Sequence, residues 1–229
     1  MLILSIDTST TVCSVALHQN GVLLGCYELF VERTSSAMLT SLIDDVVRQT
    51  SFTLNQLDAV AVAMGPGSYT GLRIGVSTAK GLCFALDKPL IAVNTLAAMA
   101  EQIRGFYPAE MLLCPMIDAR RMEVYCAFYD TTGEERVPTK AEIIDEHSFT
   151  DQLSHQPVVF FGDGAAKCQA VLGQQPNAIF PEQVVVPSAR TIGKLATALV
   201  AAGQVENPAT FEPFYLKDFM TTQPRKTVV

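Results

Sequence analysis

The order of strand and helix patterns occurs twice along this chain of 229 residues, and that repetition limits the folds open to it. The first half begins with apolar strand patterns at 2–7, 12–17 and 22–29, the last two joined by the hairpin signal Asn20-Gly21. A helix at 36–48, a strand at 59–64, a helix at 70–86, a strand at 89–93 and a helix at 95–104 follow. An antiparallel meander that leads into alternating strands and helices predicts a mixed sheet flanked by helices.

The second half starts the same order again. We expect strands at 111–117 and 123–129, a turn at 131–133, one or two short strands after it, a strand at 158–161, and helices at 165–172 and 189–202. The sequence therefore predicts two α/β lobes. Gly105 and Pro108 break the helix between the halves, which divides the chain into residues 1–108 and 109–229. No low-complexity linker separates these parts, so we expect the lobes to pack firmly.

Charge and apolar content narrow the classes of partner. The formal net charge is -7, so the surface repels a phosphate backbone, and tight binding of RNA or DNA by this chain alone is not expected. Apolar residues make up 49% of the chain, yet no stretch approaches the ~18 uninterrupted apolar residues of a membrane helix. The surplus predicts a buried face between subunits, with no membrane association.

The cysteines and the N-terminus indicate a reducing compartment. The six cysteines show neither the paired spacing of a zinc site nor a disulfide framework. The sequence opens directly on a strand pattern, without a basic leader, so we expect a cytoplasmic protein.

A glycine-rich run, Gly65-Pro66-Gly67-Ser68-Tyr69-Thr70-Gly71-Leu72-Arg73-Ile74-Gly75, joins the strand at 59–64 to the helix at 70–86. Its spacing matches neither the Walker phosphate loop nor the dinucleotide fingerprint. Gly71, Gly75 and Ala79 recur at every fourth position and form a flat stripe along the helix. The stripe either packs on the protein's own sheet or accepts a helix from another chain, and the sequence leaves both open.

These motifs resemble a known family. Asp7-Thr8-Ser9, the glycine-rich run, Ala79-Lys80-Gly81-Leu82, Ile117-Asp118-Ala119-Arg120 and the closing Pro213-Phe214-Tyr215-Leu216 together are similar to the bacterial TsaB (YeaZ) family. The resemblance covers the whole chain. It implies two tandem ribonuclease H-like lobes of the actin, sugar-kinase and Hsp70 superfamily. It also implies a non-catalytic subunit for attaching threonylcarbamoyl to the adenosine beside the tRNA anticodon, with the catalytic paralogue TsaD and the ATPase TsaE as partners.

The sequence argues against a metal enzyme. TsaD-like enzymes carry two metal-binding histidines at i and i+4 in the helix after the strand at 90–93, where this chain has Thr95 and Met99. These side chains cannot replace two imidazoles, and the three histidines, His18, His147 and His155, show no ligand spacing. We expect no metal and no catalytic residue. The alternatives are a glycoprotease-like metallopeptidase, for which neither zinc ligands nor a triad is found, and a small-molecule kinase of the same superfold.

Two turns are expected to be remnants of a nucleotide site. In the superfamily the first phosphate turn has a glycine two residues after the aspartate, and here Asp7 and Thr8 are followed by Ser9. Gly162-Asp163-Gly164 resembles the turn that cups adenosine, and Asp163 is equally suited to cap the next helix. We expect no tightly bound cofactor, and ATP only at a site shared with a partner. Asp118 and the arginines after it could bridge the lobes.

The partner surface is predicted on the helices at 36–48 and 70–86. Gly71 and Gly75 would leave room for a helix from another chain. The apolar anchors expected beside them are Met38, Leu42, Leu72 and Val76. The same surface would form a homodimer of the free protein and a heterodimer with TsaD, so that tRNA is reached only through the complex.

Overall fold

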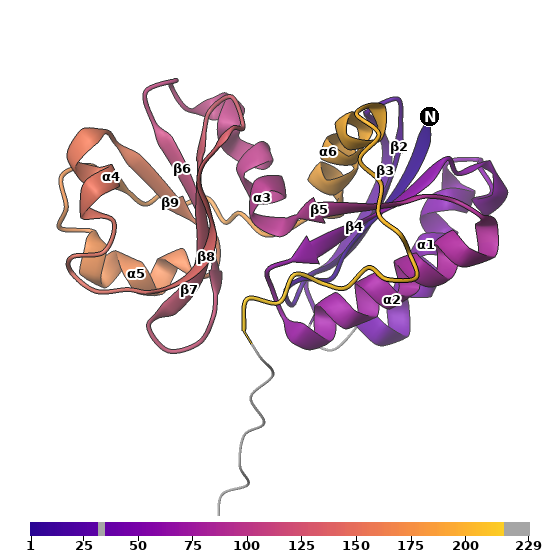
Figure 1. Ribbon diagram of the computed structural model, residues 1–229, viewed down its shortest axis with the longest axis horizontal. Helices are drawn as coiled ribbons and strands as arrows, with labels where there is room; N and C mark the ends of the chain where they lie inside the picture. Colours follow the sequence, from indigo (N-terminus) through magenta and orange to yellow (C-terminus); the bar gives the residue numbers. More distant parts are fainter. Residues whose placement is uncertain (32–34, 218–229) are drawn as a thin grey trace, which may run out of the picture.

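The computed structural model describes residues 1–31 and 35–217, which form two five-stranded sheets (Figure 1). The first sheet has the order β3-β2-β1-β4-β5. Its strands are β1 (Leu2–Asp7), β2 (Cys13–Gln19), β3 (Val22–Leu29), β4 (Ala59–Gly65) and β5 (Leu90–Asn94). β2 is antiparallel to both β1 and β3, whereas β4 is parallel to β1 and β5. The predicted meander followed by parallel strands is confirmed.

The second sheet repeats this connectivity. Its order is β10-β9-β6-β7-β8, so that read from β8 it matches the first sheet strand for strand. The strands are β6 (Leu112–Asp118), β7 (Glu123–Asp130), β8 (Glu135–Ile143), β9 (Val158–Phe161) and β10 (Ala178–Ile179). The predicted repetition of the architecture is therefore present at the level of topology.

Helices cover both faces of the first sheet. α1 (Ser35–Gln49) and α2 (Tyr69–Leu86) pack on the face that carries Leu2, Leu4 and Ile6 of β1. α6 (Ala189–Ala201) packs on the other face, which carries Ile3. Successive side chains of a strand point to opposite faces, and every residue of β1 is buried, so this strand is covered on both sides.

The predicted boundary after residue 108 separates the strands but not the helices. α3 (Thr95–Ile103), expected in the first lobe, buries Leu96 and Met99 against the second sheet. α6, expected in the second lobe, buries Ile192 and Ala196 against the first sheet. Both helices lie between the two sheets (Figure 1). The division into 1–108 and 109–229 is wrong for these helices because an apolar helix face specifies burial without specifying which sheet covers it.

The remaining helices are short. α4 (Thr150–His155) and α5 (Ala165–Leu172) pack on the face of the second sheet opposite α3. The 3₁₀ turn η1 (Leu54–Gln56) begins with a Thr53–Gln56 capping box, and η2 (Arg104–Phe106) follows α3. None of the described helices is long and apolar enough to cross a membrane.

The C-terminal segment 205–217 returns along the first lobe (Figure 1). The Glu206 N–H donates to the Leu90 carbonyl over 2.8 Å, and the Phe214 N–H donates to the Met64 carbonyl over 2.8 Å. Lys217, at the end of this segment, forms an ion pair with Glu123 of the second lobe. The segment therefore ties the two lobes together.

Candidate functional site

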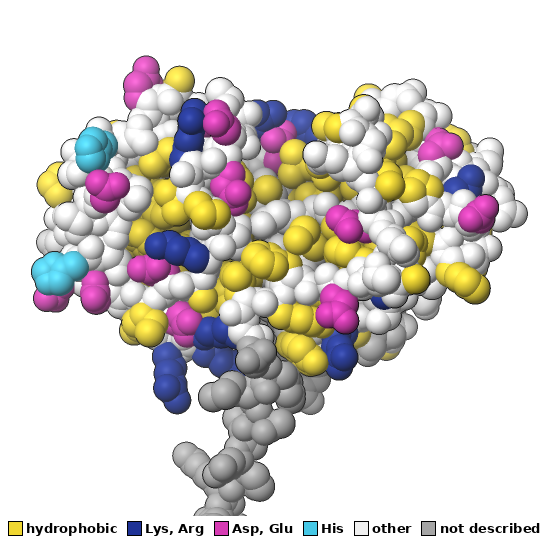
Figure 2. Space-filling view, viewed as in Figure 1, with side chains coloured by type: hydrophobic (Ala, Val, Ile, Leu, Met, Phe, Trp, Pro, Cys, Tyr) yellow, Lys and Arg dark blue, Asp and Glu magenta, His cyan; other side chains and the backbone are white. Residues whose placement is uncertain are grey.

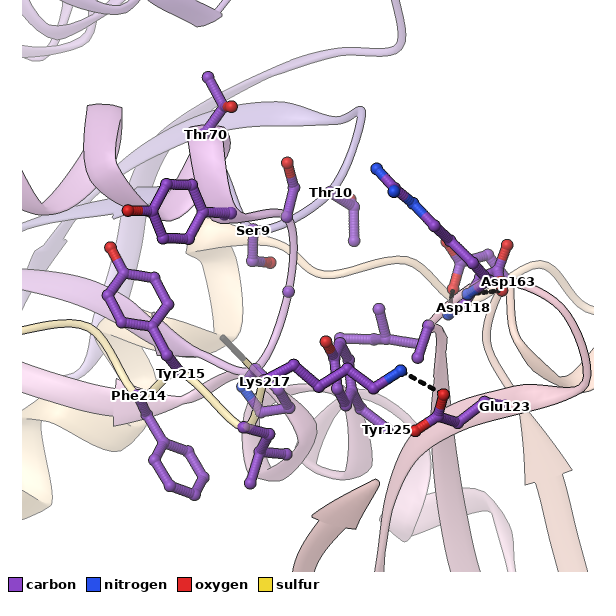
Figure 3. Close-up of a pocket in the computed structure, with 18 of the residues that line it drawn as sticks. Ser9, Thr10, Thr70, Asp118, Glu123, Tyr125, Asp163, Phe214, Tyr215 and Lys217 are labelled. Atoms are coloured by element: carbon purple, nitrogen blue, oxygen red, sulfur yellow. Dashed lines mark hydrogen bonds and ion pairs between the residues drawn. The ribbon is translucent and has the colours of Figure 1, made fainter. Parts of the chain in front are cut away.

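A cleft of about 640 Å³ lies where the two lobes meet. Its first-lobe wall consists of the turn after β1 and the loop before α2, and its second-lobe wall consists of the hairpin between β6 and β7 (Figure 3). The C-terminal segment, with Phe214, Tyr215 and Lys217, forms a further side. The Tyr215 ring packs on Tyr69 with their centroids 4.9 Å apart, and the Arg73 guanidinium lies 5.0 Å from the Tyr69 ring.

The carboxylate of Asp7 accepts hydrogen bonds within the turn after β1 and stabilises that turn. One of its carboxylate oxygens, Oδ1, accepts hydrogen bonds from the Ser9 N–H at 2.8 Å and from the Ser9 hydroxyl at 2.6 Å. The residue is only 1% exposed, and Oδ2 has no hydrogen-bond partner among the described residues. Burial raises the pKa of Asp7 to about 6. The Ser9 N–H that would face an anion is thus engaged by a neighbouring side chain.

Gly67, in the loop before α2, and Gly71, in the first turn of α2, pack closely on the same turn. A Cβ on Gly67 would clash with the Ser9 carbonyl oxygen, and a Cβ on Gly71 would clash with that of Thr8. The Ser68 N–H donates to the Ser9 carbonyl at 2.6 Å. In the expected nucleotide turn, formed by Asp7, Thr8 and Ser9, the Ser9 N–H is therefore bound to the Asp7 carboxylate. The Ser9 carbonyl is bound to Ser68 at the start of α2.

The expected partner surface is wrong in most of its residues. A Cβ on Gly75 would clash with the Thr8 hydroxyl, so the stripe of Gly71 and Gly75 faces the protein's own β1 turn. Leu42, Leu72 and Val76 are buried inside the first lobe. The physical reason is that the turn after β1 covers the inner side of α2. Of the six residues, Met38 is exposed, at 40%.

The second turn packs on β6 in the same manner. A Cβ on Gly162, whose φ is +102°, would clash with the Met116 carbonyl, and one on Gly164 would approach Ile117 to 2.9 Å. The capping role considered for Asp163 is wrong, because Gly164 is the N-cap of α5. Asp163 Oδ1 instead accepts a hydrogen bond from the Asp118 N–H at 3.0 Å. Burial raises the pKa of Asp163. These glycines set α5 close to the end of β6.

The hairpin between β6 and β7 presents two arginines to the cleft. Arg120 and Arg121 have φ values of +72° and +50°, a region in which side chains other than glycine cost roughly 1–3 kcal/mol each. The Arg120 N–H donates to Asp118 Oδ1 at 2.8 Å, which fixes the turn. Asp118 pairs with Lys167 of the same lobe, and so the predicted bridge between lobes through Asp118 and these arginines is wrong. The lobes are bridged instead by Lys217 and Glu123.

The two positions at which the resemblance implies metal ligands in TsaD-like enzymes lie in the core here. Thr95 and Met99 are fully buried, and Met99 packs in the cluster between α3 and the second sheet. His18 is buried beneath α6, whereas His147 and His155 are exposed. Among residues 1–31 and 35–217, no group of three or more His, Cys, Asp or Glu side chains is placed to hold a metal ion.

The sequence interpretation missed the two features that complete the cleft. It used Pro213-Phe214-Tyr215-Leu216 only as a family signature, although two aromatic residues and a following lysine were a signal for a packed segment. It treated Arg120 and Arg121 only as ion-pair donors. Both arginines have positive φ in the loop of residues 119–122 between β6 and β7, a backbone region that is unfavourable for residues other than glycine.

Comparison with known proteins identifies the family. The family model described as "TsaD: tRNA N6-adenosine threonylcarbamoyltransferase" matches residues 29–219. The Haemophilus influenzae protein named "tRNA threonylcarbamoyladenosine biosynthesis protein TsaB" is 41% identical over an alignment of 233 residues. This alignment covers 96% of this chain and 95% of that protein. The Escherichia coli protein of the same name is 33% identical over 226 residues, 95% of each chain.

Solved structures agree with this assignment. The structure titled "YeaZ from Pseudomonas aeruginosa" has a TM-score of 0.80 and 30% identity, and the match covers 94% of this chain and 99% of that one. The activator of the 2-hydroxyisocaproyl-CoA dehydratase from Clostridium difficile shares the fold alone, with a TM-score of 0.50 at 11% identity over 90% of this chain and 99% of that one. The predicted fold class, two α/β lobes with mixed sheets flanked by helices, is confirmed. The chain belongs to the TsaB (YeaZ) family of tRNA threonylcarbamoyladenosine biosynthesis proteins.

Proposed function

We propose that this protein is a non-catalytic subunit in the threonylcarbamoylation of tRNA adenosine, working in the cytoplasm. The observation that carries the proposal is the match of 41% identity over 96% of the chain to a protein named for this biosynthesis. The buried Thr95 and Met99 support the non-catalytic role, since they stand where a TsaD-like enzyme would have metal ligands. No observation on the described residues favours the metallopeptidase or kinase alternative.

The partner is a TsaD-type catalytic subunit, joined by a TsaE-like ATPase. Support comes from the match of residues 29–219 to the TsaD family model, because two chains of similar fold can pair through equivalent surfaces. The same reasoning favours a homodimer of the free protein. Any ATP is then held at a surface shared between subunits, because the Ser9 turn is closed.

The outward sides of α1 and α2 are the proposed contact surface. In α2, Phe84 is 89% exposed, and a Cβ on Gly81 would meet no atom within 4 Å. Gly81 thus provides the open space that was expected at Gly71 and Gly75. Met38 adds an exposed apolar side chain on α1. An exposed aromatic residue beside a small one can anchor a helix from another chain.

The surface is tested by the substitution Phe84→Asp in a co-purification with a TsaD-type subunit. A charge placed at the centre of an apolar contact should weaken association at least tenfold while the free chain stays folded, because Phe84 contributes little to the core. The matched control is Phe106→Asp, which changes another largely exposed phenylalanine, at 76%, outside α1 and α2. Unchanged association of the Phe84 variant would place the interface elsewhere.

The role itself is tested by deleting the gene and measuring threonylcarbamoyladenosine in total tRNA by mass spectrometry. We expect the modified nucleoside to be lost and to return with the wild-type gene. With its net charge of -7, the isolated protein should bind tRNA no more tightly than roughly 10⁻⁴ M at physiological salt. Normal modification after deletion would contradict the proposed role.

A further inference from the structure

The first sheet ends on one side in a strand with an open edge. β3 pairs with β2, and among residues 1–31 and 35–217 no strand pairs with its other edge. Unpaired N–H and C=O groups on such an edge can accept a further strand. Large apolar side chains in and just after β3 are 37–66% exposed; they are Val22, Leu23, Leu24, Tyr27 and Phe30. This edge is therefore both open and apolar.

The other sheet edges are protected. β5, at the opposite end of the first sheet, is bridged by the C-terminal segment, in which Glu206 pairs with Leu90. In the second sheet, β10 has only two residues. β8 occupies the position that β3 has in the first sheet; it carries Arg136, Pro138 and Lys140, and its pairing with β7 shifts register twice. Charged side chains, proline and bulges are features that prevent pairing at an edge.

Charge does not protect β3. Its eight residues include no proline, lysine or arginine, and Glu28 is their only charged side chain. Glu28 accepts a hydrogen bond from the Ser188 hydroxyl, and its Oε2 lies 3.9 Å from the Arg190 guanidinium, so its charge is compensated within the chain. By contrast, Figure 2 shows side chains of both charges over the second lobe, where β8 lies. Two copies of β3 can therefore approach each other without local repulsion.

A second copy of the chain matches this edge by symmetry. Two identical strands that pair antiparallel about a two-fold axis exchange equivalent N–H and C=O groups, so the open groups of one copy meet those of the other. The exposed apolar side chains of two such strands amount to roughly 1,000 Å², at the lower end of specific interfaces. We propose that β3 pairs with β3 of a second copy, which gives a weak, reversible dimer with one sheet continuing through both molecules.

This contact is separate from the proposed surface on α1 and α2 and does not depend on the proposed function. A chain with both contacts would form species larger than a dimer. Phe84→Asp removes the helix contact, so sedimentation velocity of this full-length variant isolates the strand contact. We expect a monomer at about 1 µM and a dimer at about 200 µM, the range of a weak interface.

A lysine on the edge should prevent the pairing. Tyr27→Lys, added to Phe84→Asp, places like charges on the two strands and should weaken the dimer at least tenfold. The matched control is Ile143→Lys, because Ile143 is 72% exposed at the end of β8, the equivalent edge strand of the second lobe. This control should leave the dimer unchanged.

An exchange of charges identifies the partner as a second copy. Tyr27→Glu alone should also be monomeric, and an equimolar mixture of the Lys and Glu variants should regain the dimer. In a pairing centred near the middle of β3, the two positions 27 are close enough for their opposite charges to attract. Association of the mixture also shows that both variants are folded.

Hydrogen exchange reports on the backbone contact itself. Raising the concentration of the Phe84→Asp variant should slow the exchange of β3 amides and leave β8 amides unchanged. The proposal is overturned if this variant stays monomeric at about 200 µM, if the Lys and Glu variants do not associate, or if a dimer forms without slower exchange in β3. It is also overturned if Ile143→Lys weakens the dimer as much as Tyr27→Lys, since charge in general would then control association.

Discussion

Asp7 combines complete burial with one carboxylate oxygen that has no hydrogen-bond partner among the described residues. Burial raises its pKa from 3.8 to about 6, so the folded protein binds a proton that the unfolded chain releases. The free energy of unfolding therefore decreases as the pH rises from about 4 to 6. Above that range Asp7 causes no further change. A shift of this size corresponds to roughly 3 kcal/mol at neutral pH.

Asp7→Asn should remove this penalty, because an amide oxygen still accepts the two hydrogen bonds from Ser9. We expect the free energy of unfolding to rise by up to about 3 kcal/mol at pH 7 and to change little at pH 4. Urea denaturation at both pH values measures the difference, with exposed Asp44→Asn as the control. An equal effect at both pH values would mean that the carboxylate is not desolvated.

Within α2, glycines on opposite sides of one helix should respond in opposite ways to alanine. Gly75→Ala brings a Cβ against the Thr8 hydroxyl, which should cost about 1–3 kcal/mol through displacement of the helix. Gly81→Ala meets open space and should stabilise the chain by up to about 1 kcal/mol through helix propensity. Thermal unfolding of the two variants tests this, and equal destabilisation would show that Gly81 is also packed.

The same helix shows what could be predicted at the scale of an element. The apolar period placed α2 at almost its observed bounds, and spacing alone identified Gly71 and Gly75 as one stripe. The spacing does not specify whether the stripe packs on the protein itself or on another chain. Thr8, which contacts Gly71, lies more than sixty residues before it in the sequence. A local sequence pattern cannot reveal a contact over that separation. Similarly, Arg120 and Arg121 were interpreted only as ion-pair donors. Their positive φ values depend on the geometry of the loop, which the sequence pattern does not specify.

At the scale of the whole molecule, the repeated strand order was predictable and the exchange of helices was not. Hydrophobic runs followed by turn signals predict the strands and their order along the chain. Which sheet an apolar helix covers depends on the path of the chain in space. α3 is covered by the second sheet and α6 by the first, and a salt-bridge pair, Lys194 with Glu101, joins these two helices. Each lobe therefore needs a helix that lies across the sequence boundary.

The two lobes should consequently unfold together. Removing α6 would expose one face of the first sheet, including Ile3 and Ile91, so the opening of one lobe destabilises the other. In hydrogen exchange at increasing denaturant, the slowest amides of β1 and β6 should merge into one opening free energy. A fragment of residues 1–108 lacks α6 and the segment 205–217, and it should not fold in isolation. Two separate opening free energies, or a folded fragment, would show that the lobes are independent and that α6 adds little to the first.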